Sequence, residues 1–189
     1  MKAGLEIFEL TLLPSLLNNA DTWIDIGPES ISRLESLHCA MLRNLFAVPS
    51  STPIPMLRFD VGHVTMEEMI HGKKLNFLHH LKSIENESLA GDILNLQIKY
   101  GFPGLVSECR MLIRKYKLPN IIEGNLVLDK LSWKRSVREA ILKKSEEHIR
   151  KSFCEYSKLR NESYEDEELK RKEYIKSMKL RDSRTNFRI

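Results

Sequence analysis

Apolar residues recur at three- and four-residue steps along most of this chain, a spacing that places them on one face of an α-helix. Proline fits the first turn of a helix and pushes the residue before it out of helical geometry. Gly27-Pro28 therefore starts a helix and Pro49 ends it. The apolar face of this helix consists of Ile31, Leu34, His38, Met41, Leu42 and Leu45.

Similar patterns predict helices over residues 3–18, 65–81, 87–100, 105–116 and 129–160. Pro14 should kink or restart the first of these. Pro55 argues against a regular helix across residues 54–60, and the alternative is a short turn of helix that restarts there. Thr65, followed by Glu68 three residues later, is a capping box and should start the next helix. Gly72 in the middle of that helix favours close packing.

The pattern differs in the last third of the chain. The longest predicted helix has an apolar stripe at Trp133, Val137 and Ile141, but residues 143–148 are nearly all polar, so we expect the helix to leave the core or bend there. Charged residues dominate from 161 to 179, which predicts a solvated helix or a partly ordered tail. No segment favours a strand, and the sequence therefore predicts an all-α chain.

Charge is distributed unevenly between the two parts of the 189-residue chain. Residues 1–109 contain 8 Lys/Arg and 13 Asp/Glu, whereas residues 110–189 contain 22 and 13, and the whole chain has a net charge of +4. A basic half indicates a polyanionic partner such as nucleic acid. Because many of these charges alternate in sign, a solvated helical tail remains the alternative.

Cysteine content and hydropathy bear on the compartment. The 3 cysteines are far apart in sequence, which favours a reducing, intracellular location, nuclear or cytoplasmic. No segment approaches the roughly 18 uncharged apolar residues of a membrane span, so we expect no membrane partner.

Several short strings resemble the region after the polymerase palm in reverse transcriptases of non-LTR (LINE-like) retrotransposons. That family has Pro-x-Leu-Leu-x-x-x-Glu-Thr-Trp, then a helix, then a Pro-x-Ser-Thr-Pro turn. The corresponding strings here are PSLLNNADTW at 14–23, in which Asp21 replaces the commoner Glu, and VPSSTP at 48–53. The similarity continues through LNFLHHL at 75–81, LSWKRSV at 131–137 and LRDSR at 180–184, so it covers nearly the whole chain.

The resemblance implies a thumb and the connector that follows it, without the catalytic palm. We accordingly expect an irregular, thumb-like helical bundle, then a long basic helix and a charged tail, divided at 1–60, 61–128 and 129–189. The missing palm and fingers would be partners, and the intact parent would be an RNA-directed DNA polymerase.

The residues themselves offer little for catalysis. Two-metal polymerase chemistry uses paired aspartates, and this chain has no Asp-Asp pair. His71, His79 and His80 lack the close Cys or His ligands of a structural zinc site. There is no glycine-rich phosphate loop and no Gly-x-Ser-x-Gly. We therefore expect neither enzymatic activity nor a cofactor.

Basic residues on the long helix are the remaining candidates, and they would contact phosphates without reading sequence. Trp133 beside them could anchor the helix to the core or stack on a base. On the earlier helix, Arg43 and Asn44 are duplex contacts by analogy with the family, and Arg33 adds to that sparser set. The candidates on the long helix are Lys134, Arg135, Arg138, Lys143, Lys144, Arg150 and Lys151.

Two functions remain open. The first is a non-catalytic reverse transcriptase fragment that holds the RNA/DNA template–primer duplex through phosphate contacts. The alternative is a helical protein-interaction module from a domesticated or decayed element with no nucleic-acid role.

Overall fold

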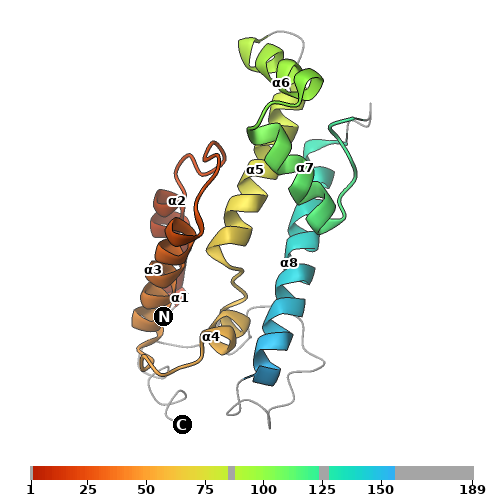
Figure 1. Cartoon of the computed structure of the whole chain (residues 1–189). Coiled ribbons are helices and arrows are strands. Elements are labelled where there is room, and N and C mark those ends of the chain that lie inside the picture. Colours follow the sequence, from red (N-terminus) through yellow and green to blue (C-terminus); the bar gives the residue numbers. More distant parts are fainter. Residues whose placement is uncertain (1, 85–87, 124–127, 156–189) are drawn as a thin grey trace. The chain divides into compact units, whose positions relative to one another are not determined.

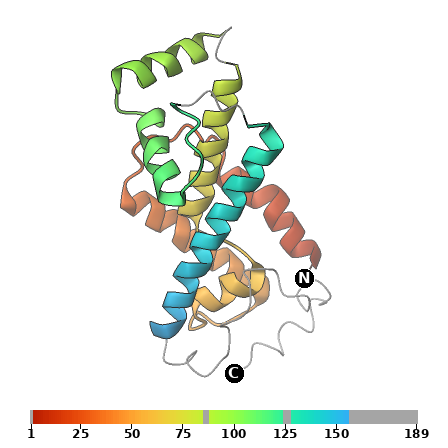
Figure 2. The same cartoon turned by 90° about the vertical axis from the view of Figure 1, so that its right-hand side faces the viewer.

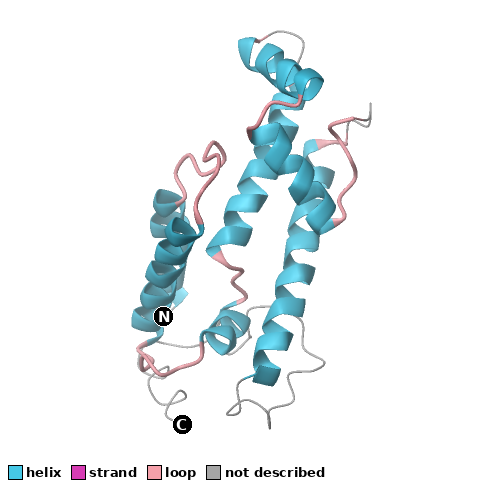
Figure 3. Ribbon diagram, in the orientation of Figure 1, coloured by secondary structure: helices cyan, strands magenta, loops and turns pink. Residues whose placement is uncertain are grey.

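The computed structural model describes residues 2–84, 88–123 and 128–155, and all regular secondary structure in these residues is helical (Figures 1 and 3). The predicted all-α class is thus confirmed for this part of the chain. The predicted tail at 161–179, and the predicted helix beyond Glu155, lie outside it. The elements are α1 (Lys2–Ile7), the π-helix η1 (Phe8–Leu12), α2 (Leu13–Leu16), α3 (Pro28–Phe46), α4 (Ile54–Val61), α5 (Met66–Ser83), α6 (Leu89–Tyr100), α7 (Leu105–Tyr116) and α8 (Lys130–Glu155).

The described residues form two compact units, each assembled from separate stretches of chain. Unit 1 consists of residues 2–18, 28–66 and 145–155, and unit 2 of residues 19–27, 67–84, 88–123 and 128–144. Helix α8 contributes to both units. The division of the sequence at residues 60 and 128 stays a prediction.

The N-terminal segment of unit 1 contains one wide helical turn just before Pro14. At this turn the N–H of Leu13 donates to the carbonyl of Phe8, and Pro14 then lies in the first turn of α2, where its missing N–H costs nothing. The restart expected at Pro14 is confirmed. Because the wide turn rotates the apolar face, Leu12 is 43% exposed, although the periodicity puts it on the face of Leu5 and Phe8.

Helix α3 and the short helix α4 complete the core of unit 1. Helix α3 begins at Pro28 as predicted, and α4 runs through Pro55. The expectation that Pro55 would prevent a regular helix there is wrong, because this proline lies in the first turn of α4, and the alternative of a short helix that restarts at this proline agrees with the structure. The buried core consists of Leu5, Phe8, Leu42, Phe46, Val48, Leu57 and Val61.

Helices α5, α7 and the first part of α8 form the centre of unit 2. A Cβ placed on Gly72 would lie 3.2 Å from Cδ1 of Ile141, so α5 and α8 approach closely there, as the mid-helix glycine predicts. Helix α5 begins at Met66, directly after the predicted cap at Thr65. Figures 1 and 2 both place α6 beyond the C-terminal end of α5.

Helix α8 does not break within its polar stretch. It remains regular to Glu155, and Ser145, in the middle of residues 143–148, is 1% exposed. The buried positions follow each other at steps of four residues, so this small serine continues the line begun by Trp133. The expectation that the helix leaves the core there is therefore wrong, because this stretch keeps a buried position where α8 passes from unit 2 to unit 1.

Candidate nucleic-acid interface

One side of α8 is fixed to unit 2 by a large aromatic side chain. Trp133 is fully buried, its Nε1–H donates to the carbonyl of Leu75 over 3.2 Å, and its ring stacks on His79 at a centroid distance of 5.7 Å. The Nε2 of His79 in turn lies 2.8 Å from the carbonyl oxygen of Leu128. These contacts leave no free face of the indole for a base. Trp133 therefore anchors the helix and does not stack on nucleic acid.

The start of α8 is held by the side chain of Asp129. Its Oδ1 accepts the N–H of Leu131 over 2.7 Å and that of Ser132 over 3.3 Å, and its Oδ2 accepts the hydroxyl of Ser132. The Ser132 hydrogen bond, followed by the two backbone N–H groups, lowers the pKa of Asp129. An ionised N-cap is thus maintained, and the exposed cations that follow are carried by a well-defined first turn.

Four exposed cations gather on the first three turns of α8. Lys130, Lys134 and Arg138 follow each other at four-residue steps and so share one ridge of the helix, and Arg135 lies beside them. No acidic residue stands three or four positions from Lys134 or Arg138 on the described helix, whereas Arg135 has Glu139 four residues after it. We call these four residues the basic patch. It contains three of the predicted candidates, and Lys130, which was not among them.

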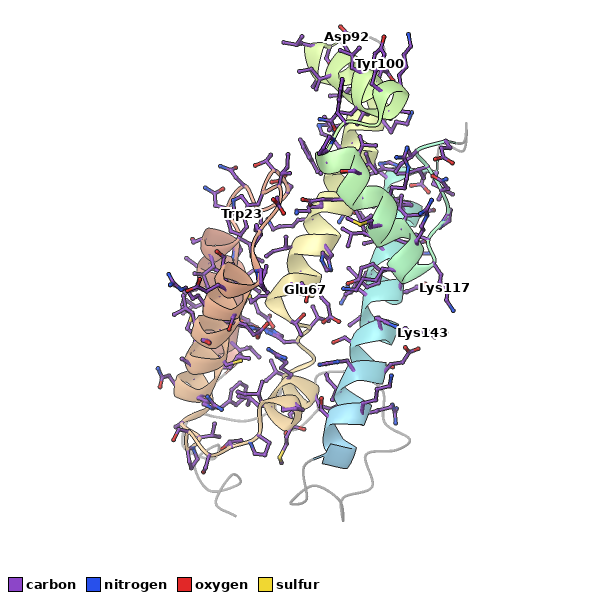
Figure 4. The ribbon with its side chains drawn as sticks, viewed as in Figure 1. Trp23, Glu67, Asp92, Tyr100, Lys117 and Lys143 are labelled. Atoms are coloured by element: carbon purple, nitrogen blue, oxygen red, sulfur yellow. The ribbon has the colours of Figure 1, made fainter. Side chains whose placement is uncertain are left out.

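The remaining predicted cations of α8 lie in a part of the helix that also contains acidic residues. Lys143 is exposed and extends from the helix (Figure 4), but Glu139 and Glu147 stand four residues before and after it. Lys151 likewise follows Glu147 by four residues. Opposite charges at this spacing pair on a helix surface, which lowers the net positive potential. Lys144 is exposed and Arg150 half-buried, and both interact with other groups of the chain.

The three candidates on α3 do not form a comparable set. Arg33 is exposed, but its guanidinium pairs with Glu29 over 2.7 Å. Arg43 is half-buried and donates from Nη2 to the carbonyl of Thr52 over 3.2 Å, so it ties the end of α3 to the following turn. Asn44 is exposed. All three belong to unit 1, whereas the basic patch belongs to unit 2.

A buried polar network in unit 1 lies on neither of these surfaces. His63 contacts Glu9 from Nε2 over 2.9 Å and His38 from Nδ1 over 3.3 Å. His38 is fully buried, and this burial lowers its pKa to about 4. Glu35 holds the other end of the network through an ion pair with Arg58 and a 2.9 Å hydrogen bond from a backbone N–H.

Unit 2 contains a second set of buried titratable groups. Lys74 pairs with Glu108, which also accepts the N–H of Asp25 over 2.6 Å. His71 contacts the hydroxyl of Tyr116 over 2.9 Å, and its pKa is lowered to about 4, chiefly by burial and next by the charge of Lys115. These groups are packed between helices and are suited to structure rather than to binding a ligand.

Metal and thiol chemistry have little support among the described residues. No three His, Cys, Asp or Glu side chains there are grouped so that they could hold a metal ion. Cys39 and Cys109 are free and buried, and burial raises the pKa of the Cys109 thiol to about 12. A thiol that stays protonated is a poor nucleophile.

No protein-family model matches the chain, and no curated protein or solved structure matches it either. The resemblance to reverse transcriptases therefore stays a prediction. None of the described helices combines the length and the apolar composition needed to cross a bilayer.

Proposed function

We propose that this chain is a non-catalytic segment of a retrotransposon reverse transcriptase that holds the RNA/DNA template–primer duplex through phosphate contacts of the basic patch. The observation that carries the proposal is the run of exposed cations on α8 with no acid on the same ridge. The family resemblance supplies the identity of the duplex and of the missing palm and fingers as partners. Polymerisation itself would belong to those partners.

The spacing of the patch suits a charged, sequence-independent contact. Four residues of helix advance by about 6 Å, so Lys130, Lys134 and Arg138 present three charges along roughly 12 Å. A duplex carries about one negative charge per 1.7 Å of its axis, so each of these side chains can reach a phosphate. Such contacts position the duplex but do not read its bases.

Salt dependence gives a quantitative test. If all four cations of the patch neutralise a phosphate, the logarithm of the binding constant falls with the logarithm of salt concentration with a slope of about −3.6. Raising salt fourfold should then weaken binding by roughly a hundredfold. Fluorescence anisotropy with a labelled RNA/DNA hybrid at two salt concentrations measures this slope directly.

Two double variants with equal charge loss locate the contact on the helix. Lys134→Gln with Arg138→Gln should reduce the slope to about −1.8, because two phosphate contacts are lost. Lys143→Gln with Lys151→Gln is the matched control and should leave the slope near that of the unmodified chain. Absence of binding at low salt, or equal slopes in the two variants, would contradict the proposal. Far-UV circular dichroism checks that both variants remain helical.

The alternative function is a helical protein-interaction module. It is favoured by a line of exposed apolar residues on α6, namely Leu89, Ile93, Leu96 and Tyr100. Charge reversal of Lys134, Arg135 and Arg138 separates the two functions. Under the first, reversal abolishes duplex binding. Under the second, duplex binding is absent from the outset and association with protein is unchanged.

A further inference from the structure

Helix α6 is apolar on two opposite sides, and only one of them is used within unit 2. Leu94 is 2% exposed, and Gly91 is buried on the same side. Gln97 is half-buried and accepts the N–H of Val106 through Oε1 over 3.4 Å. The opposite side carries the residues that a helical periodicity would assign to the core. Its members and their exposed fractions are Leu89 at 76%, Ile93 at 47%, Leu96 at 50% and Tyr100 at 58%.

The exposed side forms a continuous apolar surface. Phe102, which is 55% exposed, stacks on Tyr100 at a centroid distance of 5.7 Å and extends the line past the end of the helix. Taking about 200 Å² for each large side chain, these five residues expose roughly 550 Å² in one patch. The largest contiguous apolar patch on a typical monomer is about 300–600 Å² and is often functional, so the stripe lies at the upper end of that range. We call these five residues the α6 stripe.

The spacing within the α6 stripe is that of a two-stranded coiled coil. The steps from Leu89 to Ile93, Leu96 and Tyr100 are four, three and four residues, which is the d–a–d–a alternation of a heptad. In this register leucine occupies both d positions and the β-branched Ile93 occupies an a position, a combination that favours two helices. The stripe thus indicates a helical partner of matching length.

The charged residues beside the stripe are complementary to those of a second α6 helix that runs antiparallel to the first. Asp92 and Lys99 occupy the two g positions of this register, and both are exposed (Figure 4 labels Asp92). In an antiparallel pair each g position faces a g position of the other helix. Asp92 of one chain would then face Lys99 of the second copy, and the two-fold axis would repeat the pair. In a parallel pair Asp92 would face the uncharged Gln97, so charge matching selects the antiparallel arrangement.

We propose that the α6 stripe is the interface between two copies of this chain, related by a two-fold axis, with their α6 helices antiparallel. Ile93 packs against Leu96 of the second copy, and Tyr100 packs against Leu89 of the second copy. A two-fold interface places the same surface on both partners, as this self-complementary register requires. The interface is independent of the basic patch, which lies on α8.

The size of the stripe sets the expected strength. Stable protein interfaces bury about 800 Å² on each partner, and the stripe offers roughly two thirds of that. We therefore expect a reversible dimer whose formation depends on concentration in the range of roughly 1 to 100 μM. Sedimentation velocity of the full 189-residue chain over that range measures the dimer fraction.

An apolar-to-charged variant tests whether the stripe is the interface. Leu96→Glu places a carboxylate at the centre of the apolar contact and should leave the chain monomeric at every concentration. Leu131→Glu is the matched control, because Leu131 is 74% exposed on α8 and lies outside the stripe. This control should dimerise like the unmodified chain. Both sites are exposed, so at a concentration where the unmodified chain is monomeric, thermal unfolding should be unchanged in both variants.

A charge exchange tests the antiparallel register. Asp92→Lys alone and Lys99→Asp alone each bring like charges together twice and should weaken dimerisation about tenfold or more. The double variant Asp92→Lys with Lys99→Asp restores both pairs and should dimerise like the unmodified chain. A chain that stays monomeric throughout, a dimer that survives Leu96→Glu, or a double variant that fails to recover would overturn the proposal.

Discussion

Acidification from pH 8 to pH 5 should destabilise unit 1 through His38. This side chain is fully buried, its ring stacks on His63 at a centroid distance of 5.6 Å and on Phe8 at 5.9 Å, and its Nδ1 has no hydrogen-bond partner. The carboxylate of Glu35 lies 3.6 Å from that nitrogen but is already paired with Arg58. Hence the folded chain gains little by protonating His38.

The size of the effect follows from the pKa. Burial lowers the pKa of His38 from 6.5 to about 4, so as pH falls the unfolded chain binds this proton first. The stabilisation is complete above pH 6.5 and is lost progressively as pH falls toward 4. Because one pKa unit corresponds to about 1.36 kcal/mol, the loss at pH 5 is roughly 2 kcal/mol.

The variant His38→Gln isolates this contribution. Glutamine keeps a side-chain N–H that can donate to His63 but does not titrate. The free energy of unfolding of the variant should therefore fall by about 2 kcal/mol less than that of the unmodified chain between pH 8 and pH 5. His80→Gln is the control, because the side chain of His80 is exposed and is not buried against other rings as His38 is.

Urea denaturation followed by far-UV circular dichroism at both pH values supplies the measurement. Both tryptophans, Trp23 and Trp133, belong to unit 2, so their fluorescence reports on that unit. The variant His71→Gln applies the same test to unit 2, since burial and the charge of Lys115 also lower the pKa of His71 to about 4. Equal losses of stability on acidification in His38→Gln and the unmodified chain would refute the reasoning.

Two substitutions test the packing and the backbone of unit 2. Gly72→Leu should lower the free energy of unfolding by about 2 kcal/mol, because even a Cβ at this position would lie 3.2 Å from Cδ1 of Ile141. Urea denaturation measures this change, and a decrease of less than about 0.5 kcal/mol would contradict the prediction. Lys117→Gly should raise the melting temperature, because Lys117 ends α7 with a φ of 54°, where a side chain is strained. Arg114→Gly, at an exposed position in the last turn of α7, should lower it by the loss of helix propensity, and an equal response of the two variants would exclude the backbone explanation.

Helix boundaries were predictable where proline or glycine acts through local sterics. The start of α3 at Pro28 and the span of α7 from Leu105 to Tyr116 agree with the sequence analysis. Gly62 and Gly101 both end helices with positive φ, at 72° and 66°. The wide turn before Pro14 was not predicted. It depends on which backbone carbonyls accept hydrogen bonds near Pro14, which has no N–H to donate.

The buried side of a helix was harder to predict than its ends. On α6 the periodicity marks Leu89, Ile93, Leu96 and Tyr100, whereas unit 2 buries Leu94 and Gly91. Periodicity reports that a helix has an apolar face but not what covers it. When two faces of a helix are apolar, tertiary packing determines which of them is buried, and the local sequence of the helix does not show which one that is.

The same limit applied to the polar groups. The apolar pattern placed His38 on the buried face of α3, but its partner His63 lies 25 residues later, and no local spacing relates the two. The basic patch was easier to predict from the sequence, since Lys134, Arg135 and Arg138 lie within two turns of one helix. Lys130 was missed, although it precedes Lys134 by the same four-residue step that connects Lys134 to Arg138.

That four-residue step explains why the patch stays exposed. A helix makes one turn in 3.6 residues, so a line of residues spaced by four winds slowly around it. The buried line through Trp133 and Val137 winds in this way. Lys134 and Arg138 each follow a residue of that line by one position, so the cations keep the same angular distance from the buried side. The position of each charge relative to this line, rather than the number of lysines and arginines, therefore determines which cations of α8 are exposed together on one ridge.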